Sequence, residues 1–249
     1  MIVLKSPREI DLMKKANQIV AETHAYLADQ IAPGISTADI NKLADEFIRN
    51  KNAIPSFKDY RGYPASVCVS INEEVVHGIP AENRILNSGD IVSIDIGTLY
   101  EGFNGDAART VGVGDIDDDV QKLLDVTEKS LMLGIKNALK GNRLTDISHA
   151  VQKHVEGNGF SVVRDYVGHG IGRKMHEDPQ IPNFGPPGRG PILKTGMTLA
   201  IEPMVNMGGY EVKTLSDGWT VVTKDKSFSA HFEHTIAITD GEADILSKL

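Results

Sequence analysis

The sequence predicts an α+β fold in which two related halves surround one sheet. The expected elements follow one another as a helix pair, strands, a second helix pair and further strands, and this repetition suggests the two halves. The composition, with 41% hydrophobic and 24% charged residues, is that of a globular protein rather than a disordered one. Because neither a linker nor a strong sequence repeat interrupts the 249 residues, we expect a single domain over residues 1–249.

The first helix pair is predicted from its start signals. Ser6 and Glu9 can form a capping box, and Pro7 suits the first helical position. Apolar residues then recur at helical spacing until a Pro-Gly pair ends the helix. A second helix is expected to begin at Ser36 or Thr37, with apolar residues again on one face.

The remaining elements are strands and a second helix pair. Helical spacing predicts this pair over residues 117–139 and 145–155. Alternation of apolar and polar residues predicts strands over residues 67–71, 91–97, 103–113, 161–164, 197–201, 219–223 and 230–239. Strands therefore follow each helix pair, which is the basis for expecting two related halves.

Charge and cysteine content exclude several classes of protein. The net charge is −8, from 34 acidic and 26 basic residues, and no basic stripe or nucleic-acid-binding motif is present, which disfavours a nucleic-acid partner. The single cysteine, Cys68, rules out an intrachain disulfide and fits a reducing compartment. No apolar run is long enough for a signal peptide or a membrane span. We therefore expect a cytoplasmic protein with no membrane contact.

The hairpin predicted within residues 91–113 brings two carboxylates together. A turn centred on Tyr100 and Glu101 places Asp95 directly opposite Asp106, on the same face of the hairpin. Two negative charges at that distance are destabilising unless a proton or a cation lies between them. A register shift of one residue would separate them, and the alternative is that one of the two points to water and caps a turn.

Three later segments add further candidate metal ligands. His169 lies among glycines in GHGIG, where another backbone can approach closely. Glu202 ends an apolar strand in AIEPM, and Glu233 lies within a strand pattern in HFEHT. Each signal is weak alone, since a lone Glu in a strand usually lies at an exposed edge and a lone His is usually structural.

Taken in this order, the five residues resemble the metal ligands of the methionine aminopeptidases, which belong to the pita-bread metallopeptidases, family M24. The resemblance runs from the first helix almost to the last residue and includes SINEEVVHGIP, GHGIGRKMHEDPQIPN and MTLAIEPM. It implies a pita-bread fold with two pseudo-symmetric halves, a curved antiparallel sheet and helices on its outer face. It also implies that Asp106 and Glu233 bridge two ions, that Asp95 holds one, and that His169 and Glu202 hold the other.

The chemistry of this ligand set is consistent with the resemblance. Four carboxylates and one imidazole suit Mn²⁺, Fe²⁺, Co²⁺ or Zn²⁺, and they lack the thiolates of a structural zinc site. Four negative charges match two divalent cations, and paired metals occur in aminopeptidases. The resemblance further implies a metal-activated water or hydroxide, with Glu202 taking its proton and passing it to the leaving amine.

Two histidines and an apolar pocket complete the expected site. The resemblance implies that His176 contacts the scissile carbonyl oxygen and that His77 contacts the backbone beside the cleaved bond, roles that a hydrogen-bonding imidazole can fill. A surface or turn position is the alternative for each. The resemblance assigns the methionine pocket to Tyr60, Tyr63, Cys68, Met175 and Trp219, although ordinary core packing would also explain the aromatic residues.

The expected function is removal of the N-terminal methionine from nascent proteins with a small second residue. Glu202 and Glu233 are 31 residues apart, which leaves no room for the insertion of type II enzymes, and the chain lacks the N-terminal zinc-binding extension of longer type I forms. It therefore resembles the short bacterial type I form, for which the family precedent is a monomer. Docking to the ribosome is a further expectation without an assigned patch.

Two alternatives remain at this point. One is a proline-specific aminopeptidase or dipeptidase, although such chains usually carry a large N-terminal domain. The other is a non-catalytic binding module, since some pita-bread proteins have lost their ligands and bind histones, RNA or other proteins.

Overall fold

The computed structural model describes residues 1–248; residue 249, the last of the domain expected from the sequence, lies outside the described part. The helices are α1 (Pro7–Ala28), α2 (Thr37–Asn50), α3 (Asp118–Asn137), α4 (Leu144–Gly157) and the 3₁₀ helix η1 (Tyr60–Gly62). The strands are β1 (Ile54–Pro55), β2 (Cys68–Ile71), β3 (Glu74–Val76), β4 (Ile91–Tyr100), β5 (Phe103–Gly112), β6 (Ser161–Val162), β7 (Gly168–Gly170), β8 (Glu177–Ile181), β9 (Thr198–Ile201), β10 (Met204–Asn206), β11 (Val212–Thr214), β12 (Val221–Thr223), β13 (Ser229–His231), β14 (His234–Ala237) and β15 (Asp244–Ile245).

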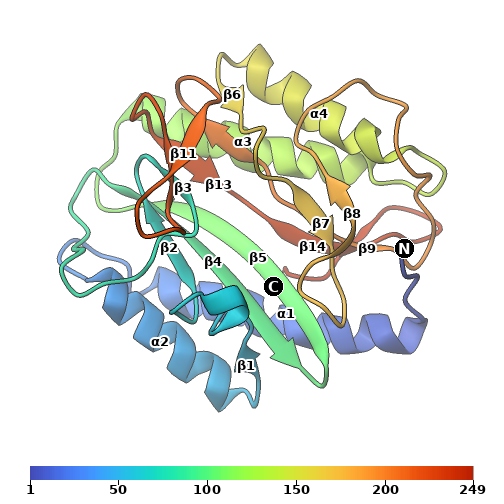
Figure 1. Ribbon diagram of the computed structural model, residues 1–249, viewed down its shortest axis with the longest axis horizontal. Coiled ribbons are helices and arrows are strands. Elements are labelled where there is room, and N and C mark those ends of the chain that lie inside the picture. Colours follow the sequence, from blue (N-terminus) through green and yellow to red (C-terminus); the bar gives the residue numbers. More distant parts are fainter. Residues whose placement is uncertain (249) are drawn as a thin grey trace.

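The two helix pairs flank the strands from opposite sides (Figure 1). Helix α1 covers the long β4–β5 hairpin, α2 lies against the neighbouring strands β1 and β2, and α3 and α4 cover strands of the C-terminal half. Hydrogen bonds group the strands into four antiparallel sheets rather than one continuous ladder: β4 with β1, β2 and β5; β15-β14-β9-β7-β8; β13-β10-β6; and β11-β12-β3. The α+β fold class is confirmed. Among the described helices, none combines the length and the apolarity that crossing a membrane would need.

Both N-terminal helices begin with a capping box, of which the sequence analysis predicted the first. Ser6 accepts the Glu9 N–H and the Glu9 carboxylate accepts the Ser6 N–H, as expected from the sequence. Of the two alternatives for α2, Ser36 is the N-cap, and it forms its box with Asp39. Helix α1 ends at Ala28, several residues before the Pro-Gly pair.

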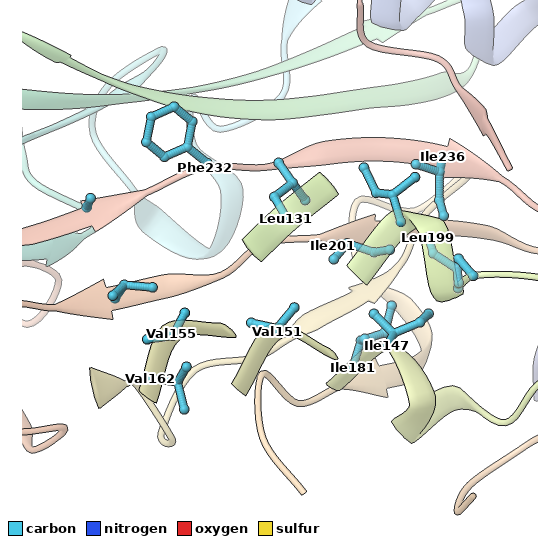
Figure 2. Close-up of a cluster of buried hydrophobic side chains, with 14 of the residues drawn as sticks. Leu131, Ile147, Val151, Val155, Val162, Ile181, Leu199, Ile201, Phe232 and Ile236 are labelled. Atoms are coloured by element: carbon cyan, nitrogen blue, oxygen red, sulfur yellow. The ribbon is translucent and has the colours of Figure 1, made fainter. Parts of the chain in front are cut away.

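Each helix pair buries an apolar face against the strands. Figure 2 shows the C-terminal core, where Leu131 of α3 and Val151 of α4 pack with Leu199 and Ile236 of β9 and β14. A second core lies under α1 and α2, and all these side chains are excluded from water. Burial of one such side chain contributes about 1.5–3 kcal/mol, so the helices hold the strands in fixed positions.

The β4–β5 hairpin turns later than the sequence analysis expected. Tyr100 pairs with Phe103, so Glu101 and Gly102 form a two-residue turn. Both have a positive φ, of 48° and 81°, as a type I′ turn requires. A glycine at the second position makes this turn accessible, and its twist matches that of the strands.

The later turn changes which residues face the two aspartates. Asp95 lies opposite Ala108, and Asp106 lies opposite Gly97, so the prediction that the two aspartates face each other directly is wrong. The register differs by two residues, and side chains alternate between faces with a period of two. Asp95 and Asp106 therefore remain on the same face, as diagonal neighbours.

The single strand expected over residues 230–239 is two strands. β13 pairs with β10, whereas β14 pairs with β9 and β15 in a different sheet. Phe232 and Glu233 lie at the junction, where the chain passes from one sheet to the other. The Glu233 N–H donates to the Ala108 carbonyl oxygen at 2.9 Å, which brings this junction against the β4–β5 hairpin.

Candidate metal centre and active site

A cavity of about 300 Å³ lies where the two halves meet. Of the twelve site residues proposed from the sequence, eleven line it: Tyr60, Tyr63, Cys68, His77, Asp95, Asp106, His169, His176, Glu202, Trp219 and Glu233. The exception is Met175, which is buried behind the wall and packs with Phe57 in a core cluster. Phe57 itself faces the cavity.

Neighbouring strands bring the five candidate ligands together. Asp95 and Asp106 come from the β4–β5 hairpin, and the Thr235 hydroxyl donates to the Asp106 carbonyl oxygen at 2.8 Å. His169 lies on β7, Glu202 directly follows β9, and Glu233 directly precedes β14. Since β9 lies between β7 and β14 in its sheet, these last three residues meet at the same end.

The two glycines beside His169 allow β7 to fit between its neighbours. A Cβ atom at Gly168 would lie 2.4 Å from the Ala200 carbonyl oxygen, and one at Gly170 would lie 2.1 Å from that of Asp178. No side chain is tolerated at such distances. The GHG segment therefore lets the two adjacent backbones approach while only the imidazole projects into the cavity.

The imidazole of His169 presents a lone pair to the carboxylates. Its Nδ1 is 2.9 Å from the Gly170 carbonyl oxygen, which can only accept, so Nδ1 carries the proton. The other nitrogen, Nε2, lies 3.7 Å from Asp106 Oδ2 and 3.5 Å from Glu202 Oε1, too far for a good hydrogen bond. Ligand atoms of Asp106, His169 and Glu233 all lie within 4.8 Å of one another, as around a shared cation.

The carboxylates are buried without the partners that their charges need. Asp106 and Glu233 are each only 3% exposed. Buried oxygens of three acids have no hydrogen-bond partner in the described part of the chain: Asp95 Oδ1, Asp106 Oδ1 and Glu233 Oε1. Burial raises the pKa of Asp95 to about 7 and that of Glu202 to about 8, and burial with the neighbouring acids raises the pKa of Asp106 and Glu233 far above the usual range.

These groups fit divalent cations. Burial also lowers the pKa of His169 to about 3, so its imidazole is neutral and able to coordinate a metal. Orphaned carboxylate oxygens around a neutral imidazole form a hard, oxygen-rich donor set. Cations would satisfy these oxygens and remove the repulsion between the acids.

The raised carboxyl pKa values predict how the metal-free protein responds to pH. Above about pH 7.5 the histidines are largely neutral in the unfolded chain as well as in the folded one, so they add little pH dependence. In the same range the folded protein still holds carboxyl protons that the unfolded chain has released, so its free energy of unfolding falls as pH rises. Urea unfolding in chelator should therefore show a lower midpoint at about pH 8.5 than at about pH 7.5.

Excess Mn²⁺ should abolish or reverse this slope, because coordination requires deprotonated ligands. A metal-free protein that becomes more stable between those two pH values would contradict the electrostatic description of the site.

His176 lies at the cavity wall and contacts two neighbouring rings. Its Nδ1 is 2.8 Å from the Tyr60 hydroxyl, and the two rings stack with their centroids 5.4 Å apart. The ring of His169 lies on another side, at 4.3 Å between centroids. A phenol is a good donor and imidazole nitrogen a good acceptor, so this contact favours the tautomer with the proton on Nε2.

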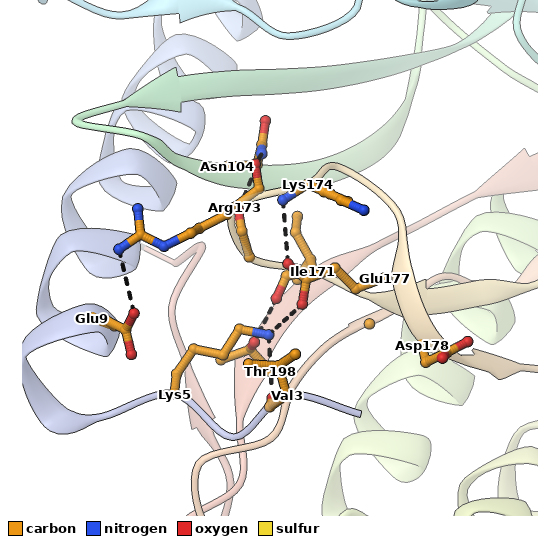
Figure 3. A network of polar contacts seen from close by, with 12 residues as sticks. Val3, Lys5, Glu9, Asn104, Ile171, Arg173, Lys174, Glu177, Asp178 and Thr198 are labelled. Carbon is orange, nitrogen blue, oxygen red and sulfur yellow. Dashed lines mark hydrogen bonds and ion pairs between the residues drawn. The ribbon is translucent and has the colours of Figure 1, made fainter. Parts of the chain in front are cut away.

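A polar network holds the backbone on both sides of His176 (Figure 3). Lys5 is nearly buried, and its ammonium contacts the Glu177 carboxylate at 2.5 Å. On the other side, the Asn104 side-chain amide donates to the carbonyl oxygens of Gly172 and Arg173, each at 3.1 Å. Asn104 lies two residues before Asp106, so the same strand positions a candidate ligand and the loop that carries His176.

His77 has a strained backbone at the opposite wall. Its φ is 61°, an uncommon value for a residue with a side chain. The imidazole contacts the rings of Tyr166 and Trp219 edge-on, at 5.7 and 6.2 Å between centroids. Burial lowers the pKa of His77 to about 4, so the ring is neutral at pH 7.

The apolar part of the cavity has a rigid wall. The Tyr63 hydroxyl donates to the Gly78 carbonyl oxygen at 2.8 Å, and the Tyr63 ring meets Trp219 edge-on at 5.2 Å. Cys68 is buried beside them and pairs with Asp95 in the β2–β4 ladder. The apolar wall therefore lies directly beside Asp95, one of the candidate metal ligands.

Sequence reasoning missed some residues of the wall. Phe57 and Tyr166 line the cavity without having been proposed for it. Tyr166 lies three residues before His169, and that closeness in sequence was the available signal. His231 also lines the cavity, and its Nε2 lies 3.6 Å from Glu202 Oε2.

Comparison with known proteins adds independent information. The sequence model of metallopeptidase family M24 matches residues 11–240. The chain is 56% identical over 247 residues to a methionine aminopeptidase of Clostridium acetobutylicum, covering 99% of each chain. It is similar to the crystal structure of a methionine aminopeptidase from Thermotoga maritima, with a TM-score of 0.99, 50% identity and 100% of both chains covered.

A prolidase from Pyrococcus furiosus has the same fold, with a TM-score of 0.81 over 99% of this chain and 66% of that chain. Its identity is only 21%, so the likeness concerns the fold alone. These similarities confirm the pita-bread architecture expected from the sequence.

Proposed function

The chain belongs to metallopeptidase family M24 and, within it, to the methionine aminopeptidases, and we propose that it removes the initiator methionine from nascent proteins with a small second residue. It is an aminopeptidase and therefore a hydrolase. The observation that best supports the proposal is the cluster of buried, unpartnered carboxylates and a neutral imidazole beside an apolar cavity.

Two divalent ions fit the charge of this cluster. Asp95, Asp106, His169, Glu202 and Glu233 would hold the ions. Bound there, Mn²⁺, Fe²⁺, Co²⁺ or Zn²⁺ would supply positive charge that makes a water molecule more acidic and offsets negative charge on the scissile carbonyl oxygen.

Three residues of the chain act on the substrate and its protons. Glu202 accepts a proton from the attacking water on a carboxylate oxygen and passes it to the leaving nitrogen. His176 donates from Nε2 to the scissile carbonyl oxygen as negative charge develops there. His77 hydrogen-bonds to the backbone beside the cleaved bond.

The methionine side chain occupies the apolar part of the cavity. Tyr63, Cys68 and Trp219 form one wall, Phe57 forms another, and Tyr60 lies toward His176. Met175 acts from behind this wall by packing on Phe57 rather than by touching the substrate. We carry the preference for a small second residue over from the resemblance to the methionine aminopeptidases.

Matched tripeptides test the substrate proposal. We expect the metal-loaded protein to release methionine from Met-Ala-Ser much faster than from Met-Leu-Ser, because the larger second side chain clashes with the wall. A peptide with proline in second place and alanine first tests the proline-specific alternative. Faster cleavage of that peptide than of Met-Ala-Ser would contradict the proposal.

Tyr60→Phe tests how His176 is held. The variant keeps the stacked ring and loses only the hydroxyl that contacts Nδ1, so the Nε2–H tautomer loses its support. We expect kcat for Met-Ala-Ser to fall roughly tenfold with a small change in KM. This is the lower end of the loss of activity that follows when a residue orienting a functional histidine is removed. Nitrogen-15 NMR should show a mixture of His176 tautomers.

Tyr63→Phe is the matched control for the tautomer. It also removes one phenol hydroxyl from the cavity wall, but that hydroxyl donates to Gly78 and not to His176. The His176 tautomer should be unchanged in this variant. An unaltered tautomer and kcat in Tyr60→Phe would show that the hydroxyl does not position His176.

Three further expectations stay predictions. We place the reaction in the cytoplasm, where nascent chains emerge, and the buried, reduced Cys68 is compatible with that compartment. A monomer and docking to the ribosome are likewise proposed, without an assigned surface.

A further inference from the structure

A second cavity lies on the other face of β5, behind the metal centre. It has a volume of about 210 Å³ and is enclosed by α1, β5, the start of β14 and the C-terminal segment. Side chains alternate along β5, so Asp106 faces the metal centre whereas Ala107 and Arg109 face this second cavity. Glu233 is the one residue that lines both cavities among the described part of the chain.

The wall of this second cavity is rich in donors and positive charge. Its polar side chains are His24, Arg109, His234, Ser247, Lys248 and the shared Glu233. Arg109 and Lys248 form no ion pair with any residue from 1 to 248. The single carboxylate of the described wall, Glu233, is assigned to the metal ions, so no other acidic side chain among residues 1–248 lines the cavity beside the two cations.

The two histidines are anchored so that each keeps one nitrogen without a partner. His24 Nε2 donates to the Ala107 carbonyl oxygen at 3.0 Å, and His234 Nδ1 lies 2.8 Å from the Ser247 hydroxyl. The remaining nitrogens, His24 Nδ1 and His234 Nε2, form no hydrogen bond with the described residues. Burial, and then the charge of Arg109, lowers the pKa of His24 to about 4, so its ring adds no charge at pH 7.

We propose that this second cavity binds a small oxyanion of the phosphate class. An oxyanion would pair with Arg109 and Lys248 and accept a hydrogen bond from His234 Nε2, which carries the ring proton when Nδ1 accepts from the Ser247 hydroxyl. Because these groups come from α1, β5, β14 and the C-terminal segment, the bound anion would tie that segment to the body of the protein. The effect on stability follows mass action, since only the folded chain assembles the cavity.

Thermal unfolding with inorganic phosphate tests the proposal. We expect a saturable rise in the unfolding midpoint of the metal-loaded protein, relative to chloride at equal ionic strength. The same rise should occur in chelator, which separates the cavity from phosphate bound to metal. Methyl phosphate, a phosphomonoester, tests which form of the anion binds. An equal rise in the midpoint with methyl phosphate indicates that the cavity binds a phosphomonoester, whereas a rise with inorganic phosphate alone indicates that it binds the free ion.

Arg109→Gln and Lys248→Gln should each lose most of the phosphate response while keeping their midpoint in chloride, because both side chains are exposed at the cavity mouth. Lys136→Gln removes an exposed cation from α3, outside the cavity, and should respond like the parent. A rise that does not saturate, or one of equal size in Arg109→Gln, would overturn the proposal.

Discussion

Asp106→Asn should nearly abolish methionine release while stabilising the metal-free protein. Asp106 is the most central acid of the cluster: it is buried, it lies diagonal to Asp95, and it is 3.7 Å from His169 Nε2. An amide of the same shape cannot neutralise two cations, so we expect metal affinity to fall more than about 100-fold. Turnover should fall by about 10³-fold or more, as when a buried electrostatic group is lost.

The metal-free form should respond in the opposite direction. Burial and the charges of Asp95 and Glu202 raise the pKa of Asp106, so removing its acidity relieves repulsion in the folded state. Urea unfolding in chelator at about pH 8 should therefore show a higher midpoint than in the parent, and added Mn²⁺ should raise it little.

Glu101→Gln is the matched control for this variant. It removes one carboxylate from the same hairpin, but at the exposed turn far from the cavity. Turnover and the stabilisation by metal should both be unchanged. If Asp106→Asn kept the metal response and the turnover of this control, Asp106 would not be a metal ligand.

Glu202→Gln should retain more metal than Asp106→Asn but lose the proton transfer. Its amide oxygen can still coordinate a cation, whereas neither amide atom can carry a proton from water to the leaving nitrogen. Loss of a general base costs roughly 10²–10⁴-fold in kcat, so we expect a fall in this range with a small change in KM. Single-turnover release of methionine from Met-Ala-Ser measures it directly.

The position of Glu202 makes this substitution specific. The residue follows β9, and the Asn183 side chain donates to its carbonyl oxygen at 2.9 Å, an interaction that does not involve the carboxylate. Glu211→Gln, on an exposed segment, provides the matched loss of one carboxylate. If Glu202→Gln turned over as fast as that control, another group would have to be the base.

The sequence predicted the elements well where local rules decide them. The capping box at Ser6 depends on residues three positions apart, so the sequence alone contains the whole interaction. The face of the hairpin that carries Asp95 and Asp106 was likewise predictable, because it depends only on the period of two.

Features decided by distant segments could not be predicted in this way. The break at Phe232 and Glu233 arises because the flanking strands pair with different partners, and a single strand pattern contains no signal for it. The turn at Glu101 and Gly102 is local by contrast, and the glycine at its second position was a signal that the sequence analysis did not use.

The wall of the cavity beside the metal centre likewise depends on packing that the sequence does not reveal. The family resemblance assigned Met175 to the cavity wall, but Phe57 lies in front of it. Which of two packed apolar side chains faces a cavity is decided by rotamers and by the close approach at Gly97, where a Cβ atom would lie 2.7 Å from both side chains. The contact between Tyr60 and His176 joins segments 116 residues apart, beyond the reach of local sequence rules.

Methionine release as a function of metal loading is the most direct test of a two-metal methionine aminopeptidase. The protein is stripped with chelator, shown to be folded, and titrated with known equivalents of Mn²⁺ or Co²⁺ while free methionine is measured from Met-Ala-Ser. We predict no release from the stripped protein and a rise in activity that levels off at two bound equivalents. Full activity after stripping, or no release from folded protein that has bound two equivalents, would contradict the account.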